Sequence, residues 1–164
     1  MFGSDGEVSD GYRQVGSGIV NAYNAIVLID NGDYVAGSIT ASETEDVISI
    51  GTLQAGQKVT ITLAFLKRAR FTSGTHSINS SNFVQSDLSD LDLYICPANL
   101  YLQNYCSRTS GHVGSYTSNN NVEKIIYTAT VTGEHLICID KYEGQGSYEI
   151  IYGVSWLVDD NSLK

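Results

Sequence analysis

The sequence is poor in proline, in basic residues and in long apolar runs. One Pro, one Met and one Trp occur among 164 residues, and nine Lys and Arg stand against eighteen Asp and Glu, for a formal charge of −9. This acidity argues against nucleic-acid binding, because phosphate recognition needs a basic face. No run approaches the roughly 20 apolar residues of a membrane helix, and the first residues lack the charged and apolar regions of a signal peptide. We therefore expect no nucleic-acid partner and no membrane insertion.

The residues that are abundant are typical of strands and turns. Sixteen Gly and eleven Tyr accompany many Ser, Thr and Asn, and 42% of the chain is hydrophobic. Tyr and β-branched residues favour strands, whereas Gly, Asn and Ser favour turns. The composition is ordinary for a folded protein and predicts a mostly β domain.

One segment near the N-terminus has helical periodicity. Within residues 18–28, Ile19, Tyr23 and Ile26 recur at i, i+4 and i+7, the spacing of one helix face. The polar residues 30–33 then end the pattern. We predict a short helix over 18–28, preceded by an extended tail.

Beyond residue 30 the apolar side chains recur at every second position, which indicates half-buried strands. Leu91, Leu93 and Ile95 give one such pattern, and we expect these three side chains to face the core. Residues 67–86 lack any pattern and are predicted to be a mobile or edge-capping loop. The expected strands are 59–65, 91–96, 125–129, 135–140 and 148–156, with shorter ones at 34–39, 47–50 and 100–105. About eight strands with one polar face each predict an all-β fold, an antiparallel β-sandwich of two sheets.

The histidines do not indicate a catalytic site. A nucleophilic triad needs a serine, a neighbouring base and oxyanion donors, and no Gly-x-Ser-x-Gly motif is present. His76 lies in the patternless segment, and His112 lies in a Gly/Ser turn. His135 occupies a strand position that calls for an inward aromatic side chain. We therefore expect no catalytic residues in this chain and a core position for His135.

An acidic segment at the start of one strand is a candidate metal site. Asp90 and Asp92 project from the same strand face at i and i+2, and carboxylate oxygens suit Ca²⁺. The glycine and terminal Glu of an EF-hand loop are missing. The alternative interpretation is that these carboxylates bond a neighbouring turn or keep an exposed sheet face polar. Calcium, bound by Asp90 and Asp92, is the one cofactor that the residues suggest.

The three cysteines leave at least one thiol without an internal partner. If 91–96 and 101–106 form a hairpin, Cys96 and Cys106 lie at opposite ends, too far apart for a disulfide. A bridge between Cys96 and Cys138 is feasible if their strands are neighbours, and free thiols are the alternative. Four tyrosines could stack on sugars or could instead stabilise the sheet as cross-strand pairs: Tyr94, Tyr101, Tyr105 and Tyr142.

Several segments, taken in order, resemble parts of secreted subtilisin-like serine proteases. Residues 16–26, GSGIVNAYNAI, resemble the final helix of the catalytic domain. Residues 89–95, SDLDLYI, resemble the Asp-Leu-Asp-Leu-Tyr core strand of the jelly-roll, or pre-peptidase-like, C-terminal domains of such proteases. Residues 122–133 and 148–156 continue the likeness, which covers about residues 16 to 156. The chain departs from the family pattern at His135, Cys96 and Cys138.

The resemblance implies a division into residues 1–30, a tail and a helix left from the catalytic domain, and residues 31–160, a jelly-roll-like sandwich. It implies a non-catalytic accessory domain, extracellular or at the cell surface, that stabilises the catalytic domain of its parent protease or helps bind protein substrate. Some family members bind Ca²⁺, and this property transfers only to Asp90 and Asp92. The alternative function is a stand-alone carbohydrate- or protein-binding β-sandwich module.

Overall fold

In the computed structural model the described part of the chain forms a β-sandwich preceded by a helix. The structure describes residues 22–66, 70–71, 83–84, 90–102, 111–116, 121–142 and 149–159. The chain divides into two compact units, residues 1–32 and 33–164. Within the described ranges, no helix is long and apolar enough to cross a membrane.

The first unit contains helix α2 (Ala22–Asn31). The predicted helix is therefore confirmed from residue 22 and extends three residues further, while residues 18–21 lie outside the described part of the chain. Gly32 ends the helix with a φ of 72°, a left-handed conformation that glycine adopts without strain. Ile26 and Ile29 are exposed within this unit.

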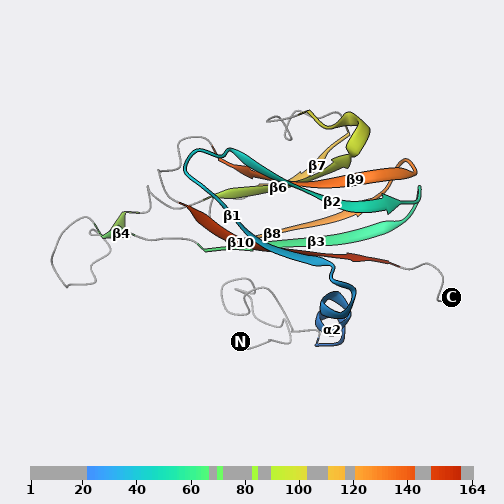
Figure 1. Cartoon of the computed structure of the whole chain (residues 1–164), viewed down its shortest axis with the longest axis horizontal. Coiled ribbons are helices and arrows are strands. Elements are labelled where there is room, and N and C mark those ends of the chain that lie inside the picture. The colour runs from blue at the N-terminus through green and yellow to red at the C-terminus, as the bar shows by residue number, and fades with distance from the viewer. Residues whose placement is uncertain are drawn as a thin grey trace, which may run out of the picture. The chain divides into compact units, whose positions relative to one another are not determined.

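The second unit contains two four-stranded antiparallel sheets packed as layers (Figure 1). Sheet A has the order β1 (Tyr34–Ile39), β10 (Ile150–Val158), β3 (Lys58–Phe65) and β8 (Val122–Thr128). Sheet B has the order β2 (Glu45–Leu53), β9 (Gly133–Lys141), β6 (Leu91–Pro97) and β7 (Val113–Ser115). Two short strands, β4 (Arg70–Phe71) and β5 (Phe83–Val84), pair with each other. The eight strands of the two sheets make the jelly-roll arrangement, which confirms the predicted sandwich.

The core lies between the sheets and consists of the inward positions of both. Leu91, Leu93 and Ile95 on β6 have no exposed surface, so the predicted inward face of this strand is confirmed. His135 is equally buried, as expected. Its Nδ1 lies 2.9 Å from the Gly133 carbonyl and its Nε2 lies 3.3 Å from the Tyr127 hydroxyl. These contacts satisfy the polar atoms of a buried imidazole.

Two expectations about the middle of the chain differ from the structure. The strand predicted over 100–105 is wrong at its start, since η3 (Ala98–Leu100) is a 3₁₀ helix and the two residues after it are irregular. Pro97, with a φ of −61°, ends β6 because proline lacks the N–H that a ladder needs. Strand β6 pairs with β7 and β9 instead. The patternless segment 67–86 contributes β4 and β5, and the rest of it lies outside the described residues.

Candidate functional site

The two candidate calcium ligands lie at the beginning of β6 in different environments. Asp90 directly precedes the strand and is only 6% exposed. The expectation that it projects from an outward strand face together with Asp92 is therefore wrong, because Asp90 is buried. Its carbonyl accepts a hydrogen bond of 3.2 Å from the Tyr142 N–H. Asp92 is half-buried, and alternation along β6 places it on the outer face of sheet B.

Asp92 belongs to a row of three carboxylates on that outer face. The strand register places Asp92 opposite Asp140 on β9, and Asp140 opposite Glu45 on β2. Burial, followed by the charges of Asp90 and Glu123, raises the pKa of Asp92 to about 6. Burial, followed by Glu45 and Asp92, raises the pKa of Asp140 to about 6 as well. Like charges directly opposite each other are unfavourable in a sheet, so this row is destabilising when it is fully ionised.

Tyrosines surround the carboxylate row. The Tyr94 hydroxyl donates a 3.4 Å hydrogen bond to Asp92 Oδ2, and the Tyr101 hydroxyl donates one to Glu45. The Tyr94 ring lies against Gly114, where a Cβ atom would approach the ring to 2.6 Å. Burial and the neighbouring carboxylates raise the pKa of Tyr94.

The candidate sugar-stacking tyrosines therefore have different roles. Tyr94 is buried, and its ring centroid lies 5.6 Å from that of His112 and 6.4 Å from that of Tyr116. Tyr101 is half-buried, and its hydroxyl is bonded to Glu45. Tyr142 is exposed, and Tyr105 lies outside the described residues. Tyr94 and Tyr101 thus make contacts within the protein, Tyr94 from strand β6 and Tyr101 from the irregular segment after η3. Neither sugar stacking nor a cross-strand tyrosine pair is tested by these contacts.

The described residues do not by themselves fit a calcium site. Ca²⁺ takes six to eight oxygen ligands, and Asp90 and Asp92 are only two carboxylates. No group of three or more His, Cys, Asp or Glu in the described ranges is arranged to hold a metal ion. The assignment of Asp90 and Asp92 as calcium ligands stays a prediction.

The cysteines form part of a small apolar cluster on the outer face of sheet B. Cys96 is buried and free, whereas Cys138 is disulfide-bonded. Of the two alternatives, the bridge between them is therefore excluded, and the free thiol holds for Cys96. Their strands are neighbours, but the register places Cys96 opposite Leu136 and Cys138 opposite Tyr94. Burial, followed by the charge of Glu45, raises the pKa of the Cys96 thiol. The remaining cysteine, Cys106, lies outside the described residues.

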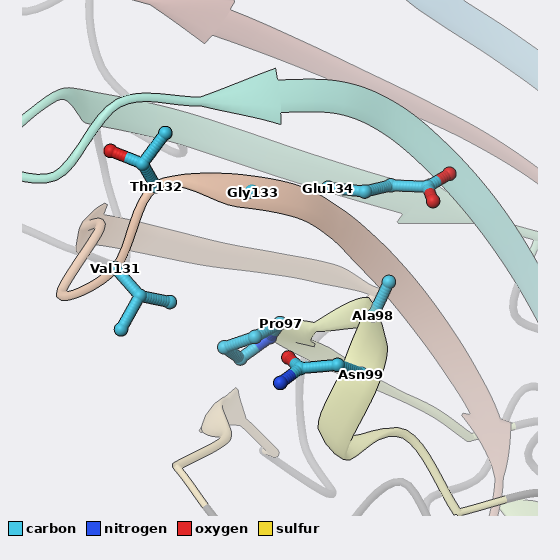
Figure 2. A pocket seen from close by; sticks show the side chains of 7 residues that line it. All are labelled: Pro97, Ala98, Asn99, Val131, Thr132, Gly133 and Glu134. Carbon is cyan, nitrogen blue, oxygen red and sulfur yellow. The ribbon is translucent and has the colours of Figure 1, made fainter.

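A hollow of about 610 Å³ lies beside η3, at the turn between β8 and β9. Pro97, Ala98 and Asn99 line one side of it, and residues 131–134 line the other. Figure 2 shows the side chains of Val131, Pro97 and Asn99 extending toward the same space, while that of Glu134 points away from it. The Glu134 carboxylate instead accepts a 2.6 Å hydrogen bond from the Ser49 hydroxyl.

Comparisons with known proteins find a likeness only among solved structures. No protein-family model matches the sequence, and no curated protein matches it. The pre-peptidase C-terminal domain of collagenase from Bacillus anthracis is similar over 76% of this chain and 87% of that chain. The TM-score is 0.45 and the sequence identity is 14%. Similarity at this level assigns neither a family nor an activity to the chain.

Proposed function

We propose that the chain is a non-catalytic accessory domain of a secreted subtilisin-like serine protease. One observation carries the proposal. The Asp-Leu-Asp-Leu-Tyr segment that resembles the core strand of such domains forms β6, which lies between β9 and β7 in a jelly-roll sandwich. Its apolar residues Leu91, Leu93 and Ile95 are fully buried, which is the role that a core strand requires.

The order of elements along the chain supports the same function. The helix that resembles the last helix of the catalytic domain ends at Asn31, and β1 begins at Tyr34. In this proposal the sandwich directly follows the catalytic domain of an extracellular enzyme. Its partner is that catalytic domain, which it stabilises or supplies with protein substrate.

The polar side chains inside the sandwich support a structural role. Tyr127 and His135 are bonded to each other, and the Tyr152 hydroxyl donates to Asp46. The Ser115 hydroxyl likewise donates to Glu123. Each pair joins residues of different strands, so these groups hold the sandwich together.

The gene sequence upstream of Met1 tests the proposal. It should encode the Asp, His and Ser motifs of a subtilisin-like catalytic domain, and an upstream reading frame without them would contradict the proposal. Removal of residues 33–164 from the parent enzyme should lower its melting temperature or its kcat/KM for a protein substrate, while kcat/KM for a short peptide substrate serves as the control. A glycan array should stay silent. Specific glycan binding would favour the alternative carbohydrate-binding module.

A further inference from the structure

The open edges of sheet B carry features that discourage the pairing of further strands. Natural sheets protect their edges with short strands, charges, proline or bulges. Strand β7 has only three residues. Strand β2 begins with Glu45 and Asp46, and its register against β9 shifts between Ser49 and Thr52. Both edges are therefore protected.

The two edges of sheet A differ from each other. Strand β8 carries Glu123 and Lys124. Strand β1, with the sequence YVAGSI, carries no charge and no proline, and its six residues pair with β10 without a register shift. Among the strands of the two described sheets, β1 alone presents an edge without any of these protective features.

The main-chain groups that β1 presents at this edge follow from its ladder with β10. The Trp156 N–H donates to the Asp33 carbonyl over 3.0 Å, so these two residues form a hydrogen-bonded pair. Hydrogen-bonded and non-hydrogen-bonded pairs alternate in an antiparallel ladder. Odd-numbered residues of β1 therefore direct their N–H and C=O groups toward β10. Tyr34, Ala36 and Ser38 direct theirs toward the open edge.

The next residue in this series marks where the open edge ends. The Thr40 N–H donates to Glu43 Oε2 at 2.8 Å, and the Thr40 carbonyl accepts from Lys141 Nζ at 3.4 Å. Within the described part of the chain, no hydrogen bond uses the main-chain groups of Tyr34, Ala36 or Ser38. A strand about 20 Å long is thus available for pairing.

The side chains along β1 are suited to a further strand. Ala36 and Ser38 are small, and Gly37 has no side chain because a Cβ there would lie 2.6 Å from the Tyr152 hydroxyl. Val35 is half-buried and packs against the core. An apolar side chain on an added strand would complete the burial of Val35. The edge therefore favours an extended segment in which apolar residues alternate.

We propose that β1 binds an extended segment of a protein substrate as a fifth strand of sheet A. Recognition is by main-chain hydrogen bonds, so it tolerates many sequences that lack proline. The identity of the segment as a protease substrate rests on the proposed function. Pairing along a single strand about 20 Å long buries much less surface area than the roughly 800 Å² that each partner buries in a stable dimer. This small area favours an unfolded segment over a second folded copy of the chain.

The experiment uses the full chain and a labelled unfolded probe, reduced and carboxymethylated α-lactalbumin. Fluorescence anisotropy should show saturable binding, and hydrogen exchange of the Ala36 and Ser38 amides should slow when the probe is bound. Ala36→Pro removes one outward N–H without removing a bond to β10. It should weaken binding by about tenfold or more. Ala36→Val keeps the N–H and should bind like the unaltered chain.

A second pair of variants covers the case in which Ala36→Pro does not fold. Ala36 and Ala64 lie in one row on the outer face of sheet A, at the edge and on the central strand β3 respectively. Ala36→Lys should weaken binding because lysine blocks edge pairing, whereas Ala64→Lys adds the same charge and should not.

Three results of the binding experiments would overturn the proposal. These are the absence of saturable binding, equal weakening by both lysine variants, and binding that Ala36→Pro leaves unchanged in a folded chain. Protection of the β1 amides that rises with chain concentration in the absence of probe would identify a second copy as the occupant, and would overturn the proposal too. Binding is measured on this chain alone. An upstream gene without protease motifs would therefore refute the proposed function and leave the strand-addition result standing.

Discussion

Replacement of Asp140 by Asn should stabilise the protein at neutral pH. Asp140 lies between Glu45 and Asp92 in the carboxylate row of sheet B. Burial and these two neighbours raise its pKa to about 6, so the folded state disfavours its ionised form. Asn has nearly the same shape and no charge, and therefore removes the repulsion while it keeps a polar side chain in place.

The sign of the pH dependence follows from the direction of this pKa change. The pKa of Asp140 is higher in the folded state than its ordinary value of 3.8, so the folded state binds more protons between pH 4 and pH 6. The contribution of Asp140 to stability is greatest below pH 4 and declines as the pH rises to 6. Above pH 6 it stays at its lower value. The Asn variant should lack this decline.

The size of the effect is modest because Asp140 is only half-buried. A rise in pKa from about 4 to about 6 corresponds to about 3 kcal/mol if it is taken at full value. Solvent screening of a half-exposed carboxylate reduces this to about 1 kcal/mol. We therefore expect Asp140→Asn to raise the melting temperature by about 3 °C at pH 7.5. The pKa of Asp92 should fall, because one of its charged neighbours is removed.

Thermal melts at pH 4 and pH 7.5, in buffer with EDTA, measure this difference. The matched control is Glu149→Gln, which removes the same charge from an exposed position beside β10. The control should leave the melting temperature almost unchanged at both pH values. The reasoning is refuted if Asp140→Asn gives no gain at pH 7.5, or if it gives an equal gain at pH 4.

Three further predictions concern the core, the metal and the activity. Leu93→Ala should lower the free energy of unfolding by about 2–5 kcal/mol in a denaturant titration, since Leu93 is fully buried; a mild effect would mean that the inward face of β6 is misassigned. If Asp90 and Asp92 bind Ca²⁺, added calcium should raise the melting temperature and Asp92→Asn should abolish that response. A melt of the unaltered chain that is the same with calcium and with EDTA would eliminate the calcium prediction. The purified chain should not hydrolyse casein, and turnover that a serine-directed covalent inhibitor blocks would contradict its non-catalytic role.

The strands that alternation predicts well are those with one fully buried face. Strand β3 alternates strictly between buried and more exposed side chains, and strand β6 has one face that is fully buried. Both strands lie in the interior of their sheets, and their expected and observed bounds almost coincide. Strand β7 was missed because three residues, Val-Gly-Ser, are too few to show a period. The sequence from residue 100 has the pattern of a strand, but Pro97 ends β6 and a 3₁₀ helix follows it, so the residues directly after that helix do not form a strand.

The candidate sites depend on neighbours that alternation cannot supply. The period of two shows that the side chains of Asp92 and Asp140 project from the polar faces of their strands. Only the strand register shows that the two residues lie opposite each other. The outer face of sheet B was also expected to be polar throughout, whereas Cys96 and Cys138 are buried there in an apolar cluster. That cluster includes Tyr101, which comes from the irregular segment after η3.

The same limit applies to the open edge of β1. The sequence YVAGSI shows that β1 lacks charge and proline. A strand of the same composition in the middle of a sheet would have no unpaired edge. Strand β1 becomes a binding surface only because the topology places it outside β10, with one hydrogen bond from Trp156 setting which amides point outward. The effect of a proline substitution in β1 should therefore depend on whether the lost N–H points toward the open edge or toward β10. Proline at Ala36 should block the added strand, and proline at Val35 should instead disrupt the ladder with β10.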